Sequence, residues 1–158
     1  ADSQETFDAV QAIEDAQPML RQILGPRIRF TLQGPPAPAP ITIDRDEFIM
    51  VLINLAADSA DSMPGTGSFS MRVRIIQEIQ ALEIVFLDTG LWIVRDLRER
   101  IFEPFFTTRG KAGGTGLGLS VSRELVVLAG GSLDLADGAP DEGAAFCLRL
   151  PLAASRIQ

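Results

Sequence analysis

The sequence predicts an α+β fold, a two-layer sandwich in which helices cover one face of a mixed, mainly antiparallel sheet. The segments along the chain predict about four helices and about six strands. Hairpin-like strand pairs are mixed with helical crossovers along the chain, which favours this architecture. A length of 158 residues with 46% hydrophobic residues predicts a single domain over residues 1–158.

The N-terminal quarter of the chain predicts a helix followed by a strand. Apolar residues at helical spacing indicate an amphipathic helix over 6–24, which Pro18 is expected to weaken or kink. Residues 27–33, RIRFTLQ, alternate as in a half-buried strand. A stiff proline-rich connector over 34–40 leads to a brief strand at 41–43.

The middle of the chain predicts a helix and a pair of strands. Asp44 followed by Glu47 has the spacing of a capping box, and a helix is expected from about residue 45 to 63. Two strands, 68–76 and 81–88, are separated only by the turn-like QEIQ. We expect these strands to pair antiparallel.

The C-terminal third predicts two helices, a long loop and two more strands. A short helix is expected at 94–102, a loop over 103–114, and a helix from Thr115 to Leu128 that ends at a Gly-Gly pair. Residues 132–137 and 144–152 are expected to form strands around a turn.

Composition limits the ligands and the compartment. A formal net charge of −7 with a single lysine argues against a nucleic-acid surface, so we expect a small ligand or a protein partner. Cys147 is the only cysteine and cannot form an internal disulfide. No apolar stretch approaches the roughly 18 residues of a membrane span. The expectation is a cytoplasmic, soluble domain without direct membrane contact.

Three polar residues share one stripe of the predicted helix 45–63. Asn54, Asp58 and Asp61 stand at i, i+4 and i+7, so their oxygen-bearing side chains point the same way. The pattern is compatible with a ligand site or with an ordinary solvated face.

A carboxylate stands at the end of the strand that reads EIVFL. Asp88 ends this apolar run and Gly90 follows two residues later. Such a carboxylate can accept a hydrogen bond from an exocyclic amine, while a residue without Cβ lets a planar base approach. The alternative is an ordinary Asp-x-Gly turn.

The glycine-rich segment GGTGLGLS opens the last predicted helix. Gly114, Gly116 and Gly118 free the backbone where unpaired N–H groups and the positive helix end can receive phosphate oxygens. The segment lacks the Gly-Lys-Ser/Thr of a Walker A loop. A flexible loop without a ligand is the alternative interpretation.

Taken in order, NLAADSADSMP, DTGLW, IFEPFFTTR and GGTGLGLS resemble the N, G1, F and G2 boxes of the gyrase, heat-shock chaperone and histidine kinase (GHKL) ATPase superfamily. They most resemble the catalytic ATP-binding domain of nitrogen-regulator-type sensor histidine kinases. The resemblance implies a Bergerat-type ATP-binding fold, ATP and Mg²⁺ as cofactors, and part of an ATP-dependent protein histidine kinase in two-component signalling. Its partners would be a helical phosphoacceptor domain, absent from this chain, and a response regulator.

The resemblance also implies residue roles. Asp88 would bind the adenine amino group, Gly90 would let the base approach, and Thr115 with the glycines would border the phosphates. Asn54 starts the N box, and Asp58 occupies the place of the metal-coordinating Asn. The implied nucleotide and metal site comprises Asn54, Asp58, Asp61, Asp88, Gly90, Arg109, Lys111, Gly114, Thr115, Gly116, Leu117 and Gly118.

Two departures from the family pattern leave two functions open. Asp58 replaces the metal-binding Asn; a carboxylate can ligate Mg²⁺ but repels a polyphosphate when the metal is absent. Trp92 replaces the second glycine of the G1 box, where it either strains the backbone or stacks beside the base. The alternative function is a degenerate kinase-like domain that regulates by docking to a partner kinase or response regulator.

The chain contains no histidine, so the phosphoacceptor must lie elsewhere and this chain should not autophosphorylate on His. Because the family's dimer interface lies in the helical domain, the resemblance implies a monomer. An anti-sigma-factor serine kinase of the same superfamily is a third interpretation, which the N and F boxes match less well.

Overall fold

The computed structural model describes residues 5–35, 37–90, 100–103, 118–136 and 145–153. These residues form a five-stranded sheet and a separate two-stranded pair, with three α-helices. The helices are α1 (Ala9–Leu24), α2 (Arg45–Asp61) and α3 (Gly118–Leu128). The strands are β1 (Phe7–Asp8), β2 (Ile28–Gln33), β3 (Pro40–Ile41), β4 (Gly67–Ile76), β5 (Ala81–Asp88), β6 (Ser132–Leu135) and β7 (Ala145–Pro151).

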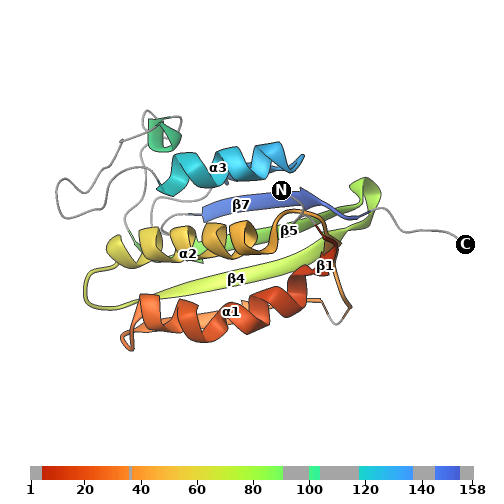
Figure 1. Cartoon of the computed structure of the whole chain (residues 1–158). Coiled ribbons are helices and arrows are strands. Elements are labelled where there is room, and N and C mark those ends of the chain that lie inside the picture. The colour runs from red at the N-terminus through yellow and green to blue at the C-terminus, as the bar shows by residue number, and fades with distance from the viewer. Residues whose placement is uncertain (1–4, 36, 91–99, 104–117, 137–144, 154–158) are drawn as a thin grey trace, which may run out of the picture.

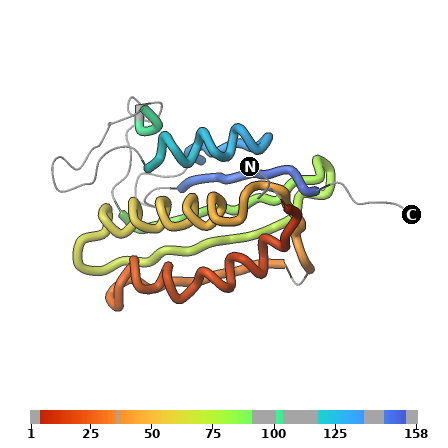
Figure 2. Tube along the Cα trace, in the orientation of Figure 1, coloured from red at the N-terminus to blue at the C-terminus, as the bar shows by residue number. Residues whose placement is uncertain are grey.

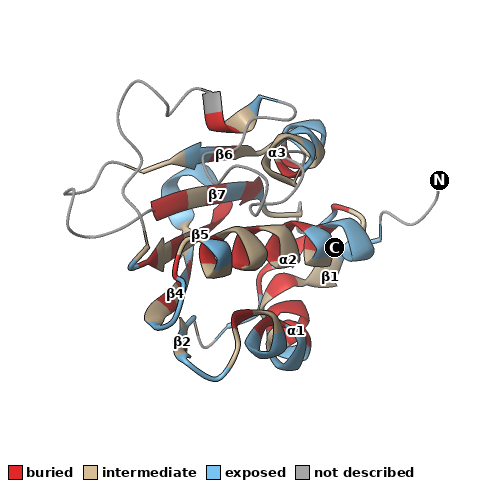
Figure 3. Cartoon of the chain, turned by 90° about the vertical axis from the view of Figure 1, so that its left-hand side faces the viewer, coloured by how far each residue is buried: buried red, intermediate tan, exposed pale blue. Residues whose placement is uncertain are grey.

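The sheet is mixed and mainly antiparallel, as predicted. Its order is β2-β4-β5-β7-β6, in which β2 pairs parallel with β4 and every other neighbouring pair is antiparallel. All three helices lie on one face (Figure 3). They run side by side in the order α1, α2, α3, and α2 packs against both of the others (Figures 1 and 2). The predicted two-layer α+β sandwich is therefore confirmed.

Alternation along the strands separates the core from the open face. Phe69, Met71 and Val73 of β4 are buried, whereas Arg72 and Arg74 between and beyond them are exposed. The largest fully buried side chains are phenylalanines from α2 and from three strands, and each contributes about 1.5–3 kcal/mol by leaving water. They are Phe48, Phe69, Phe86 and Phe146.

The start of α1 differs from the prediction. The helix begins at Ala9 rather than near residue 6, because the Asp8 side chain caps it by accepting from the Val10 N–H at 3.0 Å. Asp8 also accepts from the Ala39 N–H at 2.9 Å, which ties the helix start to the β1–β3 pair. The helix continues through Pro18 to Leu24.

Several other helices and strands also begin or end at different residues than predicted. The Asp44 side chain accepts from the Glu47 N–H at 3.0 Å, so the predicted cap of α2 is confirmed, but the helix ends at Asp61. The brief strand expected at 41–43 is present as β3 but covers only Pro40–Ile41. Of the helix expected at 94–102, the described part is a 3₁₀ turn at Arg100–Phe102. The start of the helix expected at Thr115 lies outside the described residues.

The open face of the sheet carries a charge cluster at its centre. Glu83 on β5 accepts from Arg74 Nε at 2.6 Å and from Arg149 Nε at 2.9 Å, and these residues are cross-strand partners. The Arg74 hydrogen bond is the main reason why the pKa of the Glu83 carboxyl lies below its ordinary range. Glu83 therefore stays ionised although its side chain is only 4% exposed.

Candidate functional site

The predicted site residues that the structure describes gather where three elements meet. These are the second half of α2, the end of β5 and the first turn of α3, which adjoin on the helix-covered side of the sheet (Figure 1). The α2 helix lies there because its apolar stripe, beginning at Phe48, faces the sheet.

Asn54 connects the first and the last of the predicted motifs in space. Its Nδ2 donates to Ser122 Oγ at 3.1 Å, and its amide lies 3.5 Å from the Gly118 carbonyl. Asn54 and Gly118 are 64 positions apart in the chain and were predicted from separate motifs. The contact brings the start of the N box against the helix that the glycine-rich segment opens.

Asp58 and Asp61 follow Asn54 along α2. Asp58 is half-buried and Asp61 is exposed. Among the residues that the structure describes, no three acidic, histidine or cysteine side chains form a group that could hold a metal ion. A metal at Asp58 would therefore need ligands other than the acidic, histidine and cysteine side chains of the described residues. Mg²⁺ suits such a site because it commonly takes one or two carboxylates, with water and substrate phosphates completing its shell.

Asp88 is the last residue of β5 and is 4% exposed. It pairs in register with Phe69, whose side chain is buried on the helix-covered face. Its Oδ2 accepts from Ser59 Oγ at 2.6 Å, and its Oδ1 accepts from the Gly90 N–H at 2.8 Å. The predicted adenine-binding carboxylate is thus a buried acceptor held by donors from two different segments.

Ser59 contacts the candidate site and was missed by the sequence interpretation. It occupies the buried stripe of α2, one turn after Leu55, and is 2% exposed. A hydroxyl at a core position of an amphipathic helix is the signal that was available, because buried polar groups are normally hydrogen-bonded to something specific. Its partner, Asp88, lies 29 positions away in the chain.

Gly90 lies against the C-terminal cap of α2. A Cβ at this position would overlap Ser62 Oγ and would lie 2.8 Å from both the Cβ and the carbonyl oxygen of Ser62. The sequence suggested that a glycine is needed so that a planar base can approach. The structure supplies a second reason within the protein itself, the close packing of the Asp-x-Gly turn on the end of α2.

The remaining predicted site residues lie outside the described part of the chain. These are Arg109, Lys111, Gly114, Thr115, Gly116 and Leu117, and the departure at Trp92 lies outside it as well. Their roles stay predictions from the sequence.

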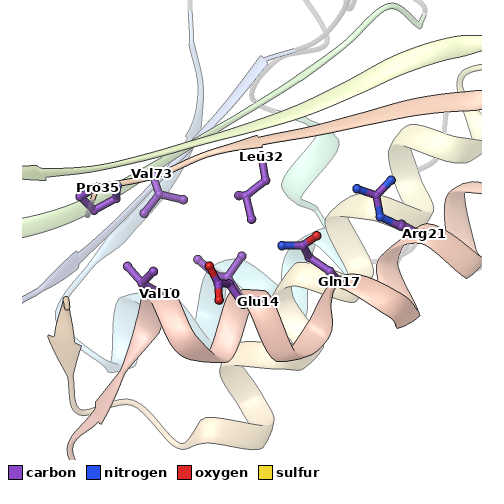
Figure 4. A pocket seen from close by; sticks show the side chains of 9 residues that line it. Val10, Glu14, Gln17, Arg21, Leu32, Pro35 and Val73 are labelled. Carbon is purple, nitrogen blue, oxygen red and sulfur yellow. The ribbon is translucent and has the colours of Figure 1, made fainter. Parts of the chain in front are cut away.

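A cavity of about 270 Å³ lies between α1 and the β2 side of the sheet. Apolar side chains, including Val10, Leu32 and Val73, line one part of it, while Glu14, Gln17 and Arg21 project from α1 (Figure 4). None of the residues that line the cavity belongs to the predicted nucleotide site. In the described ranges, no helix combines the length and the apolar character that crossing a bilayer requires.

The two-layer α+β fold is that of the catalytic domains of histidine kinases. The chain belongs to the histidine kinase-, DNA gyrase B- and HSP90-like ATPase family, whose model matches residues 43–154. The relatives and structural neighbours described below are sensor histidine kinases, and this chain corresponds to the ATPase-like catalytic domain of that class of protein.

Two curated relatives and one solved structure illustrate the similarity. The two-component sensor PprA of Pseudomonas aeruginosa is 44% identical over 156 residues, covering 94% of this chain and 16% of the relative. The sensor kinase CckA of Brucella abortus is 31% identical, covering 93% of this chain and 17% of the relative. The mycobacterial sensor histidine kinase MprB has a TM-score of 0.81 at 25% identity, covering 94% of this chain and 97% of MprB's solved chain. The chain thus spans about a sixth of the length of these curated relatives.

Proposed function

We propose that this domain binds Mg-ATP where α2, the end of β5 and the start of α3 meet, and that it presents the γ-phosphoryl group to a histidine of a separate helical domain. The observation that carries the proposal is the buried Asp88 carboxylate, which is held in place from two sides by Ser59 and Gly90. An ionised carboxylate accepts hydrogen bonds and cannot donate them, so it suits the amino group of adenine.

The neighbouring elements support a phosphate end of the site near the start of α3. Asn54 lies against the first turn of α3, where a helix N-terminus favours anions. We place Asp58 beside the metal, with Asn54 next to it, and Thr115 with the surrounding glycines along the phosphates. Arg109 and Lys111 would add positive charge. Bound Mg²⁺ neutralises phosphate charge, and positioning together with such neutralisation dominates phosphoryl transfer.

The chain's chemistry and its relatives support the proposed partners. The chain has no histidine, so the acceptor must be supplied by another domain or another protein. PprA, the 44% identical relative, is a two-component sensor, which supports a response regulator as the downstream partner. We further propose that the domain is monomeric by itself and works in the cytoplasm.

Binding of Mg-ADP tests this function directly. We expect a sub-millimolar dissociation constant by calorimetry, with a matching change in the fluorescence of Trp92, the only tryptophan. At 100 times the dissociation constant the nucleotide should raise the free energy of unfolding by about 2.7 kcal/mol. If several millimolar nucleotide produced neither heat nor a shift in melting temperature, ATP binding would be excluded.

The degenerate-domain alternative rests on Asp58 and Trp92. Because the Asp58 carboxylate can ligate Mg²⁺ but repels bare phosphates, Asp58→Asn should tighten ADP binding in EDTA by about fivefold and change it little in excess Mg²⁺. Asp46→Asn, the same charge change at an exposed position on the first turn of α2, is the control. A large gain in Mg-ADP affinity for Asp58→Asn combined with Trp92→Gly would instead favour the degenerate domain.

A further inference from the structure

Ser59 stands where packing alone calls for an apolar side chain. The buried residues of α2 are Phe48, Val51, Leu52, Leu55, Ala56 and Ser59. Ser59 is the one polar member of this set. It lies near the end of the helix, under the turn that contains Asp88 and Gly90.

The hydroxyl of Ser59 makes a short hydrogen bond to a carboxylate. Its Oγ lies 2.6 Å from Asp88 Oδ2, within the 2.5–2.7 Å range typical of a hydroxyl bonded to a charged oxygen. Ser59 is 2% exposed and Asp88 is 4% exposed, so neither group is well solvated. Such charge-assisted bonds are roughly twice as strong as neutral ones.

The bond also fixes the plane of the carboxylate. The terminal torsion of an aspartate has a broad energy profile, so the side chain does not define this plane by itself. Here one oxygen accepts from α2 through Ser59, while the other accepts from the Gly90 N–H in the following turn. Removal of the hydroxyl would take away the donor that α2 contributes to this carboxylate.

We propose that Ser59 is a positioning residue that holds Asp88 in the orientation required to select a purine with a 6-amino group over one with a 6-oxo group. The inference rests on the proposed function, in which Asp88 accepts from adenine. A 6-amino group donates to the carboxylate, whereas a 6-oxo group places a second acceptor against it. A carboxylate whose plane is already fixed loses less freedom on binding and tolerates the wrong base less well.

The test compares ADP with inosine diphosphate, which carries the 6-oxo group. In the wild-type chain, ADP should bind more tightly than inosine diphosphate by calorimetry. In Ser59→Ala we expect ADP affinity to fall about tenfold, while affinity for inosine diphosphate changes less than about twofold. Ser70→Ala, which removes a half-buried hydroxyl from β4, should leave both affinities unchanged.

The possible outcomes separate positioning from folding and from ATP binding. An unchanged ratio of the two affinities in Ser59→Ala would overturn the positioning role, while tight ADP binding by the wild type would still support the proposed function. A wild-type chain that binds neither nucleotide would overturn both. If thermal unfolding shows that Ser59→Ala does not fold, Ser59→Cys, which is nearly isosteric but a weak donor, is subjected to the same ratio test.

Discussion

Asp88→Asn is expected to weaken ADP binding by about 100-fold while leaving the domain folded. The loss corresponds to about 2.7 kcal/mol, within the range for a hydrogen bond to a charged group. The substitution keeps the size of the side chain and removes its charge. The measurement is a calorimetric titration of each protein with Mg-ADP, paired with a thermal unfolding curve in the absence of nucleotide.

The reason for this large effect lies in the donors around Asp88. The Gly90 N–H can only donate, so the amide oxygen of an asparagine must face it, at the position of Oδ1. The amide nitrogen then faces Ser59, whose hydroxyl can rotate and become the acceptor. The Gly90 N–H and Ser59 can therefore both still bond to residue 88, but the uncharged amide turns a donor toward the edge that previously accepted, which opposes the amino group of adenine.

A matched control excludes a general effect of charge. Asp134→Asn removes a carboxylate on β6, the edge strand opposite β2 in the sheet. The Asp134 side chain is 54% exposed and pairs with Arg123 at 2.8 Å. Exposed pairs of this kind contribute about 0–1 kcal/mol, so stability and ADP affinity should both stay close to the wild type. Wild-type affinity in Asp88→Asn would show that the base is not recognised at this carboxylate.

Most of the fold could be predicted because it follows from local patterns. The strand at β4 and the N-cap at Asp44 are encoded within a few consecutive residues, and both were confirmed. The β1 strand and its pairing with β3 were missed because a two-residue strand is too short to show a period. Asp8 was read as part of a helix for a related reason: one of its two donors, Ala39, is distant in sequence.

The site was predictable only where a residue's chemistry is visible without its neighbours. The Asp88 carboxylate at a strand end suggested a base-binding acceptor by its type and place. Ser59 gave a weaker signal, because a serine within a helix becomes informative only when the helix face it occupies is known to be buried. The Gly90–Ser62 packing depends on how the end of α2 approaches the turn after β5, and no local pattern encodes that approach.

Gly90→Ala is expected to destabilise the domain by about 2–3 kcal/mol even in the absence of nucleotide, because the added Cβ overpacks against Ser62. For a chain of this size the melting temperature should fall by about 5–10 °C. Binding should weaken as well, since the Gly90 N–H that supports Asp88 must shift with the backbone. Gly34→Ala is the matched control: its Cβ would meet Val73 Cβ at an ordinary 3.7 Å, so its stability should stay near that of the wild type.

A second substitution tests whether the contact with Ser62 is what destabilises Gly90→Ala. Ser62→Gly removes the Oγ and Cβ that a residue-90 side chain would meet, at the cost of the Ser62 Oγ bond to the Ser59 carbonyl oxygen. Combined with Gly90→Ala, it should recover part of the lost stability, with a coupling free energy of at least about 1 kcal/mol. The recovery stays incomplete because the Ser62 carbonyl oxygen remains 2.8 Å from the new Cβ. If Gly90→Ala instead lost ADP affinity at unchanged stability, the glycine would be required by the approaching base and not by the end of α2.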